Sequence, residues 1–113
     1  MVHELDKIDD WAIGADESDK LYLFVFDHMP WQDVGAHWAV MQMKLQNYVA
    51  FALNKDFMAY LNPETDFTKF EIDIYCADRP PKSIVRQVEK YNKQLKKMRY
   101  PIEVAIEYHP INE

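Results

Sequence analysis

A helix-like segment enclosed by two strand-like segments is the feature that most limits the folds open to this chain. Over residues 33–53, apolar side chains recur at spacings of three and four, which places them on one face of a helix. They are Val34, Trp38, Met41, Leu45, Tyr48, Val49 and Ala52. The apolar run 21–26 and the alternating run 70–76 predict strands on either side. Two strands joined through a helix are expected to be parallel, with a right-handed crossover.

The second half of the chain has the same arrangement. Pro80 and Pro81 precede a second apolar stripe, typical of a helix with proline in its first turn. The stripe consists of Ile84, Val85, Val88, Tyr91, Leu95 and Met98. A last strand then follows, with one face formed by Ile102, Val104, Ile106 and Tyr108. At the other end of the chain, residues 11–13 predict a short strand that forms a hairpin with 21–26.

These elements predict one domain, residues 1–113, with the order β-β-α-β-α-β. We expect a four-stranded mixed sheet in the order 1-2-3-4, with the first strand antiparallel at the edge and two helices on one face. Strands 70–76 and 102–108 each have a polar outer side, which favours this α+β, or α/β, two-layer sandwich over a doubly wound sheet.

Local signals predict where the elements begin and end. Asp33 suits the N-cap of the long helix, and Asn54 suits its end because asparagine tolerates the left-handed conformation. Asp56 is placed to cap a short helix over 57–61. Residues 1–8 are expected to be a loosely packed end.

Composition restricts the classes of function. The formal charge of −6 argues against nucleic acid as a partner, because phosphate binding needs a basic surface. The single cysteine, Cys76, excludes an intrachain disulfide, and its alternation with apolar residues predicts an inert core thiol. The first ten residues lack a signal-peptide pattern and no apolar run has membrane-spanning length, so we expect a cytoplasmic protein without membrane contact. No motif indicates a metal, a cofactor or a catalytic nucleophile.

Several motifs resemble those of a family of short bacterial proteins known as a domain of unknown function. The resemblance lies in Asp27-His28-x-x-Trp31, then His37, then Leu45-Gln46-Asn47-Tyr48 and Phe51. The segment Asp10-Trp11-Ala12-Ile13 and the pair Pro80-Pro81 fit the same pattern. The resemblance implies a small α/β fold and brings no established activity with it.

The first candidate site is the edge where the parallel strands end, because ligands of open α/β sheets bind there. The predicted topology brings a group of polar and aromatic side chains to this edge: His28, Trp31, His37, Asp78, Arg79 and His109. His28 would act as an acid or base and Arg79 would hold an anion. In the alternative interpretation, Asp27 and Asp78 cap helices and His28 packs in a turn.

The second candidate site is the sheet face without helices, which we expect to contact a protein. Strand 21–26 must turn either Tyr22, Phe24 and Phe26 or Leu21, Leu23 and Val25 toward this face. The neighbouring strands add Glu71, Asp73, Tyr75, Glu103 and Glu107. Aromatic residues with a charged rim are common in protein interfaces. Alternatively, the N-terminal segment folds over the apolar stripe and covers it.

The leading functional hypothesis is a non-enzymatic protein that acts through protein–protein contact. The partner is another protein or a second copy of the chain, and an immunity or antitoxin-like binder is one version. The outer side of the long helix, with Gly35, Ala36, Ala39, Met43 and Ala50, is small and apolar and favours a homodimer or packing under 57–61. The alternative is a small-ligand-binding domain or weak enzyme at the strand ends.

Overall fold

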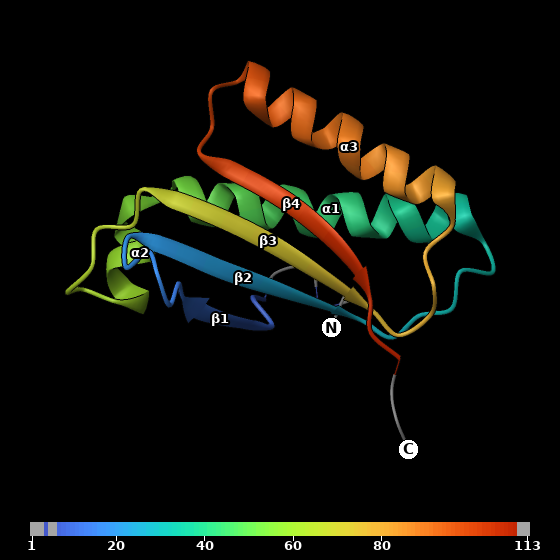
Figure 1. Ribbon diagram of the computed structural model, residues 1–113, viewed down its shortest axis with the longest axis horizontal. Helices are drawn as coiled ribbons and strands as arrows, with labels where there is room; N and C mark the ends of the chain where they lie inside the picture. The colour runs from blue at the N-terminus through green and yellow to red at the C-terminus, as the bar shows by residue number, and fades with distance from the viewer. Residues whose placement is uncertain (1–3, 5–6, 111–113) are drawn as a thin grey trace.

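The computed structural model describes residue 4 and residues 7–110. Its elements follow in the predicted order, and the short helix predicted over 57–61 is present as α2, which begins two residues earlier. They are β1 (Asp10–Ile13), β2 (Lys20–Asp27), α1 (Val34–Leu53), α2 (Lys55–Leu61), β3 (Lys69–Cys76), α3 (Lys82–Lys97) and β4 (Ile102–Tyr108). The strands form one mixed sheet in the order β1-β2-β3-β4, in which only β1 is antiparallel, as the sequence predicts (Figure 1).

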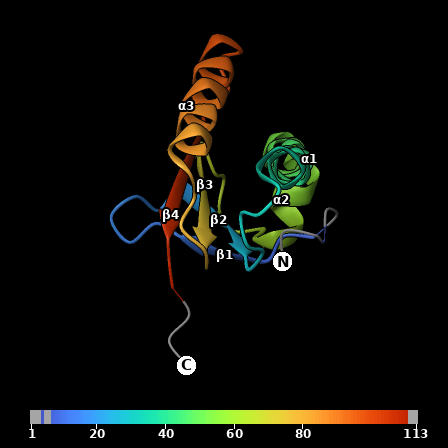
Figure 2. The same cartoon turned by 90° about the vertical axis from the view of Figure 1, so that its right-hand side faces the viewer.

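The helices cover one face of this sheet. Leu21, Leu23 and Val25 of β2 have no exposed surface, and they share one core with Met41 of α1 and Val88 of α3. Strand residues alternate between the two faces. Burial of this set therefore turns Tyr22, Phe24 and Phe26 to the opposite side, which settles the choice that the sequence left open. Figure 2 shows α1 and α2 on one side of the strands, and α3 packs against β4.

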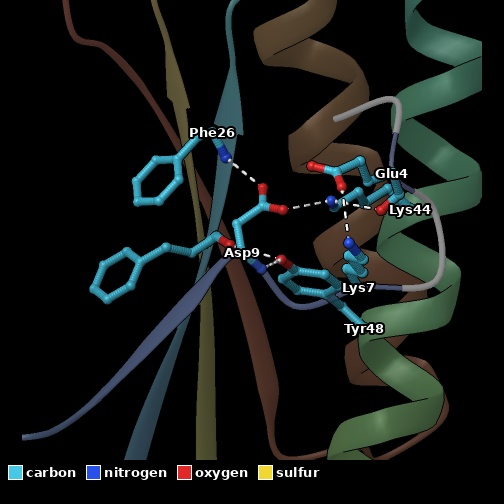
Figure 3. A network of polar contacts seen from close by, with 7 residues as sticks. Glu4, Lys7, Asp9, Phe26, Lys44 and Tyr48 are labelled. Carbon is cyan, nitrogen blue, oxygen red and sulfur yellow. Dashed lines mark hydrogen bonds and ion pairs between the residues drawn. The ribbon is translucent and has the colours of Figure 1, made fainter. Parts of the chain in front are cut away.

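A buried ion pair attaches the N-terminal segment to α1 (Figure 3). Lys44 has no exposed surface, and its Nζ lies 2.7 Å from Oδ1 of Asp9 and 2.8 Å from the backbone oxygen of Glu4. Oδ2 of Asp9 accepts a hydrogen bond from the backbone N–H of Phe26 at 2.9 Å. Burial acts to raise the pKa of Asp9, but hydrogen bonds to Lys44 and Phe26 outweigh it and leave the pKa lowered.

Tyr48 extends this network to the sheet. Its hydroxyl donates to the backbone oxygen of Phe24 at 2.7 Å and accepts from the backbone N–H of Asp9 at 2.8 Å. The expectation of a loosely packed end is therefore wrong for Glu4, and also for Ile8, which packs against the core. Residues 1–3 and 5–6 of the predicted loose end lie outside the described residues. The described part of the N-terminal segment lies on the helix side of the sheet, so it does not cover the opposite face.

Several helix-end predictions need correction. Asp33 is the N-cap of α1 as predicted, with its side chain accepting from the N–H of Ala36 at 3.1 Å. Asn54 ends α1 with φ −91° and ψ 102°, an extended and not a left-handed conformation. It also caps α2 by accepting from the N–H of Phe57, so the cap is Asn54 and not Asp56. One residue therefore serves two helices: its backbone N–H donates to the backbone oxygen of Phe51 at the end of α1, and its side chain caps α2.

The predicted inward stripes are also incomplete at their ends. Val85 and Met98 of α3 are 37% and 60% exposed, and Tyr108 of β4 is 39% exposed. Val85 and Tyr108 lie near the ends of α3 and β4, and Met98 is the C-cap of α3. The outer side of α1 is exposed as well, and α2 does not cover it; its members are Gly35, Ala36, Ala39, Met43 and Ala50.

The free edge of the sheet at β4 is protected by a side chain from α3. Nδ2 of Asn92 donates to the backbone oxygen of Val104 at 2.8 Å, and Oδ1 of Asn92 accepts from the backbone N–H of Val104 at 2.7 Å. These two bonds satisfy both backbone groups at the third residue of a strand that has a strand neighbour on one side only.

The buried ion pair predicts a large effect of Lys44→Met. This change keeps most of the side-chain volume but leaves the Asp9 carboxylate buried without its ammonium partner. We expect the free energy of unfolding to fall by about 3–5 kcal/mol. Urea denaturation followed by tryptophan fluorescence measures this loss. Lys93→Met on the exposed side of α3 is the matched control, with an expected change of about 0.5 kcal/mol or less.

The double variant Lys44→Met/Asp9→Asn removes both charges and keeps an acceptor for the Phe26 N–H. It should recover part of the stability lost in the single variant. An unfolding free energy for Lys44→Met equal to that of the wild type would contradict the assigned role of the ion pair.

Candidate functional site

The open sheet face, as we call the side of the sheet away from α1, is built by the register of three parallel strands. Nine residues form three rows of three across β2, β3 and β4. The rows are Tyr22-Glu71-Glu103, Phe24-Asp73-Ala105 and Phe26-Tyr75-Glu107. All eight residues predicted for a protein contact therefore lie on one surface, and Ala105 is the ninth. In the part of the chain that the structure describes, no helix lies over this face (Figure 2).

Three aromatic rings of the open sheet face, those of Phe24, Phe26 and Tyr75, form one continuous group. The ring centroid of Tyr75 lies 5.5 Å from that of Phe24 and 6.2 Å from that of Phe26. His109 was predicted at the strand-end edge, and its ring lies 4.2 Å from Tyr75 at the border of this face. Nε2 of His109 also lies 2.9 Å from Oε2 of Glu107. These aromatic side chains are partly exposed, except His109, which is exposed.

Asp73 occupies the centre of the open sheet face. The sequence predicts a solvated carboxylate there, but the neighbouring side chains leave only 7% of the residue exposed. The pKa of Asp73 is raised to about 8. Burial is the largest cause, followed by the hydrogen bond and the charge of Glu71 and then by the charge of Glu107, while Lys20 opposes the shift. Oδ1 of Asp73 has no hydrogen-bond partner among the described residues. A carboxyl group in this state favours the neutral form near pH 7.

The strand ends hold a second, buried group. Asp27 is the last residue of β2, and His37 comes from the first turns of α1. Nε2 of His37 lies 2.6 Å from Oδ2 of Asp27, and the two residues are 3% and 1% exposed. The Trp31 ring stacks on His37 with centroids 3.6 Å apart. Burial raises the pKa of Asp27 despite the favourable charge and hydrogen bond of His37.

Cys76 completes this buried group at the end of β3. Its Sγ lies 3.8 Å from Oδ2 of Asp27. Burial, together with the Asp27 charge, raises the pKa of Cys76 to about 12. A thiol with this pKa is almost fully protonated near neutral pH, so it is a poor nucleophile and a poor metal ligand.

The residues predicted for the strand-end site are divided among three places. Trp31 and His37 belong to the buried group, whereas Asp78 is exposed and accepts from the backbone N–H of Trp31 at 2.8 Å. His28 and His109 line a cavity of about 150 Å³. Arg79 lies over the Tyr108 ring, 4.4 Å from its centroid.

The two aspartates of the alternative interpretation bind loop backbone and do not cap helices. Asp27 accepts from the N–H of Met29 at 3.1 Å, and Asp78 accepts from the N–H of Trp31. The N-caps of α1 and α3 are Asp33 and Pro81.

Sequence reasoning missed Lys44 on the inner side of α1, and it named His37 for the strand-end site without predicting its burial. His37, Met41, Lys44 and Tyr48 follow one another at spacings of four, three and four, so the two polar residues lie on the apolar stripe itself. A lysine or histidine at such a position needs a buried partner. The spacing was therefore a usable signal, although it does not identify Asp9 or Asp27 as the partners.

Two other hollows lack a set of side chains like those of the open sheet face and the strand ends. A hollow of about 710 Å³ lies between the end of α1, α2 and the loop that follows α2. An apolar groove of about 460 Å³ lies between α1 and the end of α3, lined by Val49, Tyr91 and Met98 among others. Within the described residues, no group of three histidine, cysteine or acidic side chains could hold a metal ion, and no helix has the length and apolar character to cross a membrane.

Comparison with known proteins identifies the family. The model of the family of unknown function DUF6572 matches residues 1–108, so the chain belongs to this family. No curated protein and no solved structure matches the chain.

The raised pKa of Asp73 predicts how Asp73→Asn changes stability with pH. The native state keeps this proton up to about pH 8, whereas the unfolded chain loses it near 3.8. The free energy of unfolding of the wild type therefore falls as pH rises between these values. The asparagine variant lacks this slope and should be more stable by roughly 1–3 kcal/mol at pH 7. Denaturation at a series of pH values measures the effect. Asp66→Asn, at an exposed loop position, is the control, and equal slopes for Asp73→Asn and wild type would contradict the prediction.

The buried state of Cys76 predicts slow thiol chemistry. At about pH 8, a colorimetric thiol reagent should react with the native protein orders of magnitude more slowly than with the protein in concentrated guanidinium chloride. Absorbance after mixing measures both rates. Comparable rates in the native and denatured states would show that the thiol is accessible.

Proposed function

We propose that this DUF6572 protein binds a partner protein through the open sheet face, and that the partner offers a basic surface. The proposal rests on one observation. The strand register places Tyr22, Phe24, Phe26 and Tyr75 on the same face as four acidic side chains. Aromatic groups bordered by charges are typical of protein interfaces, where the rings provide most of the contact area and the charges select the partner.

Charge supports a basic partner. Glu71, Glu103 and Glu107 lie on the face around the mostly neutral Asp73, whereas the nearby Lys20 is already paired with Glu71 at 3.3 Å. The whole chain has a formal charge of −6, so the electrostatic field would attract a basic protein and increase its association rate. Inhibition of a nuclease or another protein with a basic site is one form that this function can take.

Charge also argues against a symmetric homodimer through this face. A two-fold axis would bring the same carboxylates of both copies together, and like charges across an interface oppose association. The exposed outer side of α1 is another surface available for self-association. Light scattering over a concentration series separates these outcomes, since a dimer that survives Phe24→Glu does not use the open sheet face.

The strand ends support a small-ligand function less well. The cavity beside His28 and His109 holds about 150 Å³, whereas small-molecule sites usually have about 300–1,000 Å³. His37 is buried against Asp27, so a ligand could reach it only if Trp31 moved. Acid–base or binding chemistry by His28 and Arg79 therefore has less geometric support than a contact through the open sheet face.

The proposal predicts that Phe24→Glu abolishes partner binding. The change places another negative charge in the middle of the aromatic group and removes a contact ring. We expect at least a tenfold loss of affinity for a purified partner, because central aromatic residues contribute about 2 kcal/mol or more to interfaces. Tyr60→Glu is the matched control, since Tyr60 is 81% exposed on α2, away from this face.

The experiment identifies the partner by affinity capture from source cells and then measures the purified pair by calorimetry. Hydrogen exchange of the complex should show protection in β2, β3 and β4, and affinity should fall as salt is added. A purified partner whose affinity is the same for Phe24→Glu and Tyr60→Glu would contradict the proposal, as would protection confined to the helices.

A further inference from the structure

We propose that the centre of the open sheet face receives an arginine side chain of the partner, with its guanidinium against Asp73 and Glu107 and stacked on Tyr75. This inference rests on the proposed function, because it names the chemical group that the same face recognises. Four observations support it, and the first three concern the space and the polar groups around Asp73.

The first observation is an unsatisfied carboxyl oxygen. Asp73 is 7% exposed, and its Oδ1 is buried without a hydrogen-bond partner among the described residues. Buried polar atoms without partners are rare in native proteins, because each one loses its hydration without replacement. An incoming N–H donor would satisfy this oxygen. The acidic residues here therefore differ from an ordinary solvated group of carboxylates.

The second observation is the small side chain beside Asp73. Ala105 is its neighbour on β4, and the longer Glu103 and Glu107 lie on either side of Ala105. On the β2 side the neighbour is Phe24. The short Ala105 side chain thus separates two long acids, so that carboxylates border Asp73 on the β4 side and the Phe24 ring borders it on the β2 side.

The third observation is that this face already places one cation, Lys20, on a similar pair of a ring and an acid. Nζ of Lys20 lies 3.3 Å from Oε1 of Glu71 and 4.8 Å from the Tyr22 centroid, one row away from Asp73. The described lysine and arginine side chains form no ion pair with Asp73. The central row thus has the acid and the rings of a cation site without a cation from the chain.

The fourth observation is the kind of cation that this setting favours. A guanidinium is planar, so it stacks on a ring such as Tyr75 and can donate two hydrogen bonds at the same time to carboxylate oxygens. It is also less strongly hydrated than an ammonium, which matters at a half-buried position. A positive charge there would favour the ionised form of Asp73, whose pKa is raised to about 8 by burial, by Glu71 and by Glu107, with Lys20 opposing.

The test uses short peptides and so does not depend on finding the partner. The full chain is titrated at about pH 7 with acetyl-Gly-Arg-Gly-amide, and with peptides carrying lysine or the neutral isostere citrulline instead of arginine. We expect the arginine peptide to shift the NMR signals of Asp73, Tyr75 and Glu107, with millimolar affinity. The citrulline peptide should bind at least about tenfold more weakly.

Variants and a proton readout separate recognition from a structural effect. Asp73→Asn should weaken the arginine peptide about tenfold, whereas Glu64→Gln, an exposed acid in the loop after α2, should leave it unchanged. Glu107→Gln provides a second variant of the site. The carboxyl ¹³C signal of Asp73 should titrate at lower pH when the arginine peptide is present. The groups that face Asp73 in this titration are Glu71, Tyr75, Phe24, Ala105, Glu107 and Lys20.

Three results would overturn the inference: equal binding of the arginine and citrulline peptides, unchanged binding by Asp73→Asn, or equal binding of lysine. The fate of the proposed function is decided separately. A partner that loses affinity for Phe24→Glu but not for Asp73→Asn would keep the interface and remove the arginine site. If the arginine peptide binds but no protein partner is found, the arginine site is kept and the proposed interface is lost.

Discussion

The ion pair between Lys44 and Asp9 is the contact on which the rest of this arrangement depends. It joins the N-terminal segment to α1, while the same Asp9 and the neighbouring Tyr48 bond to the backbone of β2. Three parts of the chain thus meet at one charged group in the core. Because these bonds are directional, they hold the described N-terminal residues on the helix side. The open sheet face remains uncovered as a consequence.

The carboxyl groups of Asp9 and Asp73 have pKa values that are shifted in opposite directions. Asp9 receives donors that more than offset its burial, so its pKa is lowered. Asp73 is buried and lies near Glu71 and Glu107, so its pKa is raised, and its Oδ1 has no hydrogen-bond partner among the described residues. A fold selected only for stability would have a neutral or apolar residue at the second position. Such local conflicts are often found where a protein meets its ligand, because the binding event supplies the missing contact.

The backbone arrangement followed from the sequence because it depends on periodicity. The three-and-four spacing of α1 and the alternation of β3 predicted the layers, the strand order and the helix-free face, including Glu71, Asp73 and Tyr75 on one side. The predicted strand-end set was divided because side-chain direction depends on tertiary packing. His37 turned inward to Asp27, ten residues away, and Arg79 turned to Tyr108. The partner of Lys44 is thirty-five residues distant and no periodicity identifies it. Burial of Asp73 depends on the lengths of side chains on two neighbouring strands, which local pattern does not contain.

The side chain of Asn92 also limits how other molecules can join this sheet. An unprotected edge strand can be extended by a strand from another chain, the mode by which many domains capture extended peptides and by which fibrils grow. At Val104, both backbone groups are already bonded to Asn92. A peptide added there would have to displace the asparagine and would lose register at its central residue. Recognition by main-chain addition along β4 is therefore blocked at Val104, the third residue of the strand.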